Sequence, residues 1–284
     1  MSRMVTGTRI IMGMPIIVEI VDRGATDREL DALWVFFTAV EAQFSTYRED
    51  SELSRINRGL LAMEDASPEM RAMIDRAIRT GDETNGYFDA WRTGTCDLSG
   101  VVKGWAIAEA ANRLHATGFH HFCVNAGGDI QTAGLNPDGM PWKIGIRNPM
   151  DVTEIVKVVH LSGEGIATSG TYERGDHIHR PHGSAIENDP VVSLTVIASD
   201  VYEADRFATA AFAMGREGIR FIGGLSKAHA SQGSGGVEAQ GKGMSERVDG
   251  AERAAFEGYQ IRASGIATST PGLRRYLTPT TAPR

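Results

Sequence analysis

The sequence predicts an α+β fold in which helices pack on a mainly antiparallel sheet. Segments with helical periodicity lie mostly in the first half, and a run of short segments rich in Val and Ile follows Phe122. The connections between the latter are too short for repeated crossover helices, which favours antiparallel pairing. With 284 residues, 42% of them hydrophobic, the chain can bury a sizeable core, and we expect one compact domain over residues 1–284.

The first elements are expected to be a strand and a helix. After Arg9, apolar residues alternate in the stretch IIMGMPIIVEI, which is typical of a strand and not of a signal peptide. Thr26 and Glu29 have the spacing of a capping box. Four apolar residues then recur on one helical stripe, namely Leu30, Leu33, Trp34 and Phe37. Together these features predict a helix over residues 26–44.

Two more helices are expected before the strands. Ser67 is suited to cap one of them, Pro68 suits its first position, and it should end near Gly81. Residues 103–117 continue with helical periodicity. Farther along, the stretch ADRFATAAFAMG, residues 204–215, is also typical of a helix.

The expected strands follow one another along the second half of the chain. They lie within residues 121–135, 142–148, 155–162 and 191–199, and a closing strand is expected after residue 257. Residues 230–252 are rich in Gly, Ser and charged residues, which indicates a flexible surface loop.

Composition and charge exclude several classes of protein. The net charge of −7 repels polyanions, and no dense cluster of Lys and Arg offsets it, so nucleic acid is not an expected partner. Cys96 and Cys123 are too few for a disulfide scaffold or a zinc site, which indicates ordinary thiols in a reducing compartment, best matched by the cytoplasm. No long apolar run predicts insertion into a membrane.

The first candidate site lies on the helix over residues 204–215. Asp205 and Thr209 are four residues apart and therefore share one helix face. Their oxygens would suit Mg²⁺ or Ca²⁺. Taken alone, the pair is explained as well by an acid near a helix N-terminus and by a hydroxyl that bonds to its own helix.

A second candidate is the stretch DLSGVVKGWA. Asp97 ends an extended segment, Gly100 exposes its backbone, and Lys103 stands near the start of a helix, where anions are favoured. This arrangement suits a nucleotide phosphate, and a capped turn with a solvated lysine explains it equally well. The stretch VNAGGDI adds two glycines and an acid that would also fit a tight hairpin.

The third candidate is a loop rich in polar groups, IATSGTYERGDHIHRPHG. Its hydroxyls, including those of Thr168 and Ser169, its backbone amides and Arg174 suit phosphate oxygens. Its histidines lack partners at the spacing of a structural zinc site.

Nine segments, taken in order, carry a resemblance to a known family. They are MGMPIIVEI, FSTYREDSELSRIN, NGYFD, DLSGVVKGWAI, VNAGGDIQTAG, WKIGIRNP, ATSGTYER, HIHRP and ADRFATAAFAMG. In this order they resemble the ApbE family, the FAD:protein FMN transferases, over nearly the whole chain. The resemblance implies a single ApbE-like, T-fold-like domain.

The resemblance also implies a site. FAD, as the substrate, would be touched by nine residues, namely Met12, Tyr47, Tyr87, Phe88, Asp89, Asp97, Lys103, His177 and Ile178. Mg²⁺ would be held by Asp205, Thr209 and the backbone carbonyl of Gly100. The polar stripe on the helix would then face a metal bound to the pyrophosphate of FAD.

The implied reaction transfers FMN to a threonine hydroxyl of a partner flavoprotein, and AMP departs. Asp205 would act through the metal, and His177 is the candidate base, with hydrogen bonding to flavin or phosphate as its alternative role. Mg²⁺-dependent hydrolysis of FAD and flavin binding without catalysis use the same pocket and stay open. The acceptor protein is not identified.

The sequence departs from the family at two places near the expected acceptor side. Arg180 stands where the family commonly has an acid, and Ala90 and Trp91 replace a usual Pro-Thr pair. The lipoprotein signal that is familiar in the family is not found, which predicts a cytoplasmic member.

Overall fold

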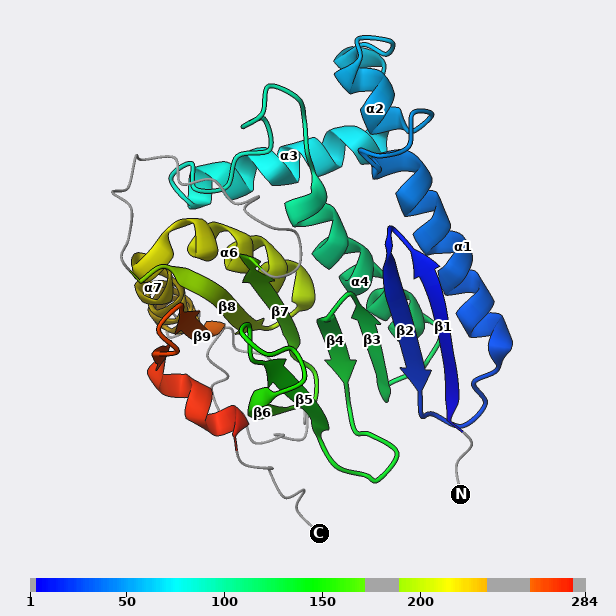
Figure 1. Cartoon of the computed structure of the whole chain (residues 1–284). Coiled ribbons are helices and arrows are strands. Elements are labelled where there is room, and N and C mark those ends of the chain that lie inside the picture. The colour runs from blue at the N-terminus through cyan, green and yellow to red at the C-terminus, as the bar shows by residue number, and fades with distance from the viewer. Residues whose placement is uncertain (1–3, 172–188, 234–255, 278–284) are drawn as a thin grey trace, which may run out of the picture.

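The computed structural model of the chain describes residues 4–171, 189–233 and 256–277. Within these residues the strands of the main sheet pair in antiparallel fashion throughout. Among these residues its strand order is β1-β2-β3-β4-β7-β8-β9-β10 (Figure 1). The strands are β1 (Val5–Ile11), β2 (Met14–Ile20), β3 (Phe122–Ala126), β4 (Asp129–Ala133), β7 (Gly165–Gly170), β8 (Val191–Ala198), β9 (Phe256–Arg262) and β10 (Ala267–Ser269). Each strand pairs with the next one in chain order, apart from the inserted hairpin of β5 (Trp142–Arg147) and β6 (Ile155–Leu161). The α+β prediction is confirmed.

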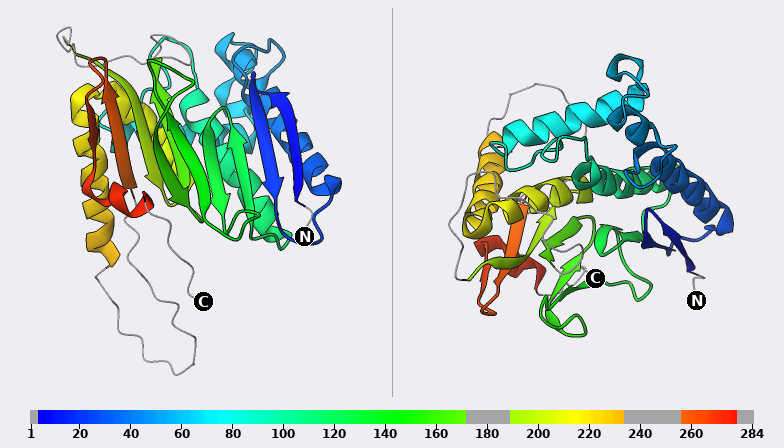
Figure 2. Two further views of the ribbon diagram at one scale, coloured as in Figure 1. Left: turned by 60° about the horizontal axis from the view of Figure 1, so that its bottom comes forward. Right: turned by 45° about the horizontal axis from the view of Figure 1, so that its top comes forward.

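Helices cover one face of this sheet (Figure 2). They are α1 (Asp27–Phe44) over β1, α4 (Ser99–Ala116) over β3 and β4, α6 (Val201–Ala213) over β7 and β8, and α7 (Gly218–Gly233) over β9. Helix α3 (Pro68–Glu83) lies outside this layer, and α2 (Glu52–Asn57) projects beside it. Three short 3-10 helices complete the described elements, namely η1 (Met63–Asp65), η2 (Gly215–Glu217) and η3 (Pro271–Tyr276).

Two helices begin where the sequence predicts. Thr26 caps α1 in a capping box with Glu29, and the Ser67 side chain accepts a hydrogen bond from the backbone of Met70 at the start of α3. Helix α4 begins at Ser99, earlier than the predicted residue 103, and the Asp97 carboxylate accepts the Ser99 N–H at 2.9 Å just before its first turn.

The core lies on both faces of the sheet. Toward the helices, alternate residues such as Val124 and Val196 are fully buried among apolar side chains of the helices. On the other face, Ile166 and Ile197 pack with the β5–β6 hairpin and η3, where Trp142 is buried. The central strands β7 and β8 are thus covered on both sides, which holds the end of β7 beside α6.

Three elements differ from the prediction. The N-terminal stretch forms a hairpin of two strands, because Met12 and Gly13 both adopt the left-handed backbone conformation of a tight two-residue turn. Thr168 and Ser169 belong to strand β7 and not to a loop. The expected flexible loop overlaps α7 at residues 230–233, and residues 234–252 lie outside the described part.

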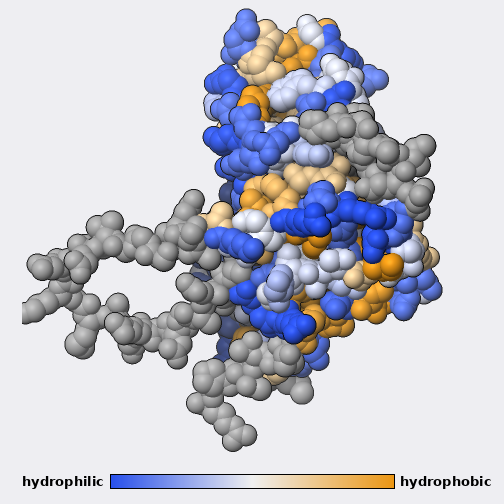
Figure 3. Space-filling view, turned by 90° about the vertical axis from the view of Figure 1, so that its left-hand side faces the viewer, coloured by the Kyte–Doolittle hydropathy of each residue, from blue (hydrophilic) through white to orange (hydrophobic). Residues whose placement is uncertain are grey.

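None of the helices in the described ranges is both long and apolar enough to cross a bilayer. On the face that carries α7, hydrophobic side chains form small areas separated by hydrophilic ones (Figure 3). Cys96 and Cys123 are both free and buried, as expected of ordinary thiols, and burial raises the pKa of the Cys96 thiol to about 12.

Candidate functional site

A cleft of about 370 Å³ opens where five segments of the chain meet. Its lining comes from Thr46 and Tyr47 after α1, from residues 87–93 after α3, from residues 97–103 at the start of α4, from Thr168–Gly170 at the end of β7, and from Asp205 and Thr209 on α6. All three clusters that the sequence singled out therefore contribute to one cleft.

Helix α6 supplies the polar stripe. Asp205 is 4% exposed and Thr209 is half-buried. The two residues are one helical turn apart, and both line the cleft. The start of α6 is fixed twice, since the Asp200 side chain caps it by accepting the Glu203 N–H, and the Val201 N–H donates to the buried amide oxygen of Gln131 on β4. The sheet thus sets the position of the Asp205 carboxylate.

Helices α4 and α6 approach closely at Gly104. A Cβ atom at this position would lie 2.7 Å from Asp205 Cβ and 2.9 Å from the Val201 carbonyl oxygen, so the contact requires glycine. The Gly104 N–H donates to Asp205 Oδ2 at 2.9 Å. In a regular helix this N–H donates to the carbonyl of Gly100, so the carboxylate competes for the donor that would otherwise engage that carbonyl.

A buried ion pair closes the floor of the cleft. The Lys103 ammonium lies 2.6 Å from Asp129 Oδ2 and 3.9 Å from Asp205 Oδ1, and the side chains of the two aspartates are 2% and 5% exposed. Asp129 Oδ1 also accepts the backbone N–H of Thr168 at 3.1 Å. One cation thus stands between two acids and joins α4, β4 and β7.

The aromatic wall comes from the turn after α3. Phe88 is buried, Tyr87 is half-buried, and the Asp89 carboxylate accepts the Trp91 N–H at 2.8 Å. Tyr47, which also lines the cleft, is 91% exposed. Such an exposed aromatic side chain leaves room for a flat ring to stack between it and the inner wall.

The structure brings together most of the residues that the sequence singled out. Eleven of them line the cleft, namely Tyr47, Tyr87, Phe88, Asp89, Asp97, Gly100, Lys103, Thr168, Ser169, Asp205 and Thr209. Met12 does not line it and instead donates its backbone N–H to Glu41 at 2.7 Å. His177, Ile178 and Arg180 lie outside the described residues.

Asp129, Arg92 and Ser99 are site residues that the sequence did not single out. Ser99 lines the cleft within the stretch DLSGVVKGWA, Arg92 lines it just after Ala90 and Trp91, and Asp129 is the acid of the VNAGGDI stretch. A tight hairpin explained this acid in the sequence, and the hairpin does form between β3 and β4. Its buried carboxylate facing Lys103 is the feature that the sequence pattern did not show.

The donor set suits a hard divalent cation. A Cβ atom on Gly100 would lie 3.4 Å from Thr209 Cγ2, so the backbone of α4 and the Thr209 side chain are neighbours. A carboxylate, a hydroxyl and a backbone carbonyl are oxygen ligands of the kind that Mg²⁺ takes, with the remaining positions left to water and phosphate. Among the described residues, His, Cys, Asp and Glu form no cluster of three suited to a metal.

The cleft combines an aromatic wall, an ammonium group and oxygen donors, a set of groups that suits a phosphorylated ligand with a ring. Solved structures with this fold include "Flavin Transferase ApbE from Vibrio cholerae", with a TM-score of 0.74 at 23% identity over 97% of this chain and 99% of that one. A second is the apo form of the Pseudomonas stutzeri flavinyl transferase ApbE, with a TM-score of 0.74 at 20% identity over 98% of each chain.

Sequence comparison assigns the family. The ApbE family model matches residues 12–93 and 91–230, and the chain belongs to this family, as the sequence predicts. The FAD:protein FMN transferase of Vibrio cholerae is 29% identical over 256 residues, with 70% of this chain and 76% of that protein covered. The Escherichia coli K12 protein of the same name is 36% identical over 131 residues, with 43% of this chain and 37% of that protein covered.

Proposed function

We propose that this chain transfers FMN from FAD to a threonine hydroxyl of a partner flavoprotein, with Mg²⁺ bound to Asp205, Thr209 and the Gly100 carbonyl. The observation that supports this most is the meeting of the aromatic segment 87–89, Lys103 and the Asp205–Thr209 stripe in one cleft. A flavin ring suits the aromatic wall, and a diphosphate suits the cationic and metal-binding floor. Relatives that carry the name FAD:protein FMN transferase support the same activity.

The proposed reaction breaks one P–O bond and forms another. The threonine oxygen attacks the phosphorus on the FMN side of the FAD diphosphate, a phosphoester forms, and the bond to the AMP phosphate breaks. The hydroxyl proton passes to a base, for which His177 is the candidate, and AMP leaves with the bridging oxygen. When bound, Mg²⁺ supplies charge neutralisation on the diphosphate as the leaving group forms.

The residues of the chain supply position and local charge. Lys103 offers a cation to a phosphate oxygen while Asp129 fixes the direction of its ammonium group. Asp205 is held by the Gly104 N–H, so its second oxygen keeps a set direction toward the cleft. Thr168 and Ser169 line the cleft at the end of β7, and the proposed role of their polar groups is to bind phosphate or ribose oxygens; the Thr168 hydroxyl also shares a hydrogen bond with the Thr195 hydroxyl at 2.9 Å.

The test incubates the protein with FAD, Mg²⁺ and candidate acceptor flavoproteins, followed by mass spectrometry of the acceptor and measurement of AMP. An acceptor threonine that gains one FMN with release of one AMP supports the proposal. AMP release without a labelled acceptor identifies an FAD pyrophosphatase instead. Binding of FAD without AMP release identifies a flavin-binding protein and contradicts the proposal.

A further inference from the structure

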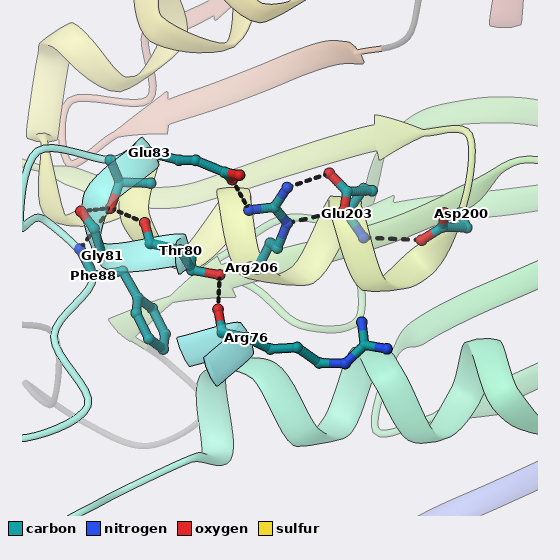
Figure 4. Close-up of polar contacts among 9 residues, drawn as sticks. Arg76, Thr80, Gly81, Glu83, Phe88, Asp200, Glu203 and Arg206 are labelled. Carbon is teal, nitrogen blue, oxygen red and sulfur yellow. Dashed lines mark hydrogen bonds and ion pairs between the residues drawn. The ribbon is translucent and has the colours of Figure 1, made fainter. Parts of the chain in front are cut away.

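Arg206 follows Asp205 on α6 but points out of the cleft, toward the end of α3 (Figure 4). Its side chain is 10% exposed and donates to both carboxylate oxygens of Glu203, at 3.0 and 2.6 Å. A third donor, Nη1, contacts the Glu83 carboxylate. Burial alone lowers the pKa of the Arg206 guanidinium, but its bonds to Glu203 and Glu83 outweigh burial and the pKa is raised.

Glu83 is the last residue of α3, so this bond joins the end of α3 to α6 across 123 positions of the chain. The guanidinium is also packed between rings, with its Cζ 3.9 Å from the centre of the Phe207 ring and 5.5 Å from that of Tyr202. An arginine held on several sides in this way has few rotamers left, so it fixes the position of the carboxylate that it binds.

The turn that follows Glu83 is rigid and leads directly to the cleft. The Thr84 hydroxyl donates to the Thr80 carbonyl at 2.7 Å and accepts the Phe88 N–H at 3.1 Å, and both threonines are fully buried. The Gly86 N–H donates to the Gly81 carbonyl at 2.9 Å. These hydrogen bonds link the end of α3 directly to the backbone of Phe88.

Phe88 in turn lies against the expected metal site. A Cβ atom on Gly100 would lie 2.8 Å from Phe88 Cε2, so the ring packs directly on the backbone whose carbonyl is the expected ligand. Thr209, another expected ligand, lies on the same Gly100 position at 3.4 Å. The route from Arg206 through Glu83, the Thr84 turn and Phe88 thus ends at the backbone between the two helices.

We propose that Arg206 is a positioning residue of the site, which acts through Glu83 and the Thr84–Phe88 turn to hold Phe88 against Gly100. Asp205 and Arg206 would then use neighbouring positions of α6 for two tasks. The first residue faces the cleft, and the second sets the distance between α6 and the aromatic wall. This inference rests on the proposed function, because the affinity for FAD and Mg²⁺ is what the wall and the Gly100 backbone are proposed to provide.

The test removes the ion pair between Arg206 and Glu83 by changing Glu83, its more exposed partner. The Glu83 side chain is 48% exposed, so Glu83→Ala should fold, whereas truncation of Arg206 would leave Glu203 without its bidentate partner. Glu83→Gln keeps an oxygen acceptor for Arg206 and serves as the conservative variant. Glu109→Ala is the matched control, because it breaks the exposed pair with Arg113 on α4 away from the cleft lining.

Two measurements are made on each variant at a temperature far below its Tm. One is FAD binding by flavin fluorescence as Mg²⁺ is varied, and the other is amide hydrogen exchange over residues 84–89. We expect Glu83→Ala to raise the half-saturating Mg²⁺ and the FAD Kd roughly 2- to 30-fold and to speed exchange in the turn. Glu83→Gln should restore most of both, and Glu109→Ala should change neither.

The outcomes separate this inference from the proposed function. If the wild-type chain binds no FAD, the proposed function fails. If the wild-type chain binds FAD and Glu83→Ala lowers only the Tm, with Mg²⁺ dependence, FAD Kd and exchange at 84–89 unchanged, Arg206 is a structural residue only and the inference is overturned.

Discussion

The Asp205 carboxylate is buried, and each of its two oxygens has a polar neighbour. One oxygen accepts the Gly104 N–H at 2.9 Å, and the other lies 3.9 Å from the Lys103 ammonium. Burial of a carboxylate is unfavourable unless such partners compensate it. The polar stripe of Asp205 and Thr209 is therefore part of a cleft wall, on a helix whose apolar residues pack on the sheet.

The first prediction concerns this carboxylate. Asp205→Asn keeps an acceptor for the Gly104 N–H, so urea unfolding should change by about 1 kcal/mol or less. Metal-dependent activity at limiting Mg²⁺ should fall by at least the roughly 10- to 100-fold that loss of an outer-shell partner causes. Asp205→Ala should lose activity similarly, and Thr209→Val less completely. Full activity of both Asp205 variants at limiting Mg²⁺ would show that the ion is not bound there.

A second prediction concerns His177, which lies outside the described residues. A base is needed only when the acceptor hydroxyl loses its proton, so His177→Ala should slow FMN transfer roughly 10²- to 10⁴-fold while FAD binding changes little. Single-turnover transfer rates and flavin fluorescence titrations measure the two effects separately. An unchanged transfer rate would rule out His177 as the base.

At the scale of elements, the site depends on the distance between α4 and α6. Gly104→Ala places a methyl group 2.7 Å from Asp205 Cβ and should destabilise the fold by about 1–3 kcal/mol. Because Asp205 is an expected ligand, the same change should also weaken the binding of Mg²⁺. Gly224→Ala on the exposed side of α7 is the matched control, because a Cβ atom there meets nothing within 4 Å. The control should be neutral or stabilising by up to about 1 kcal/mol in urea unfolding. Equal stability of the two variants would contradict the close packing.

Local signals determine which elements the sequence predicts well. The Thr26 and Ser67 caps act on neighbouring backbone, so α1 and α3 are correctly predicted at their starts. Strand β7 is missed because its polar residues resemble a loop, and its place is set by pairing with β4 and β8. The strand propensity of a local stretch does not indicate which distant strand that stretch pairs with.

The same limit applies to the candidate site. The segments at Asp97–Lys103 and Asp205–Thr209 are visible as unusual polar groups in sequence, and the family resemblance arranges them correctly around one cleft. The role of Asp129 depends on Lys103 and on the Thr168 N–H, 39 positions away, which only the fold brings within reach. Met12 is placed at the site by the resemblance, and in the structure it lies in a hairpin turn and is not among the residues that line the cleft.

For the whole molecule, the cleft is expected to recognise both halves of a dinucleotide. The aromatic wall suits the flavin, and the polar groups of the floor exceed what one phosphate needs, so FAD should bind more tightly than FMN. At 100 times its Kd, FAD should stabilise the fold by about 2.7 kcal/mol, and FMN at the same concentration by less. Flavin fluorescence titration in Mg²⁺ measures the two affinities directly. Equal values would mean that the adenylate half is not recognised.

The order of the strands has a consequence for how the molecule folds. Three strand pairs of the main sheet, β1–β2, β3–β4 and β9–β10, are hairpins that close over short turns and should form early. The Gly104 N–H and the Asp205 carboxylate, in contrast, are 101 positions apart and meet only when α4 and α6 pack. In refolding from urea, we therefore expect far-UV circular dichroism to recover before FAD binding does. Simultaneous recovery of both signals would show that the sheet and the site form in one step. A measured lag would mean that newly synthesised chains pass through an intermediate that has secondary structure but does not yet bind FAD.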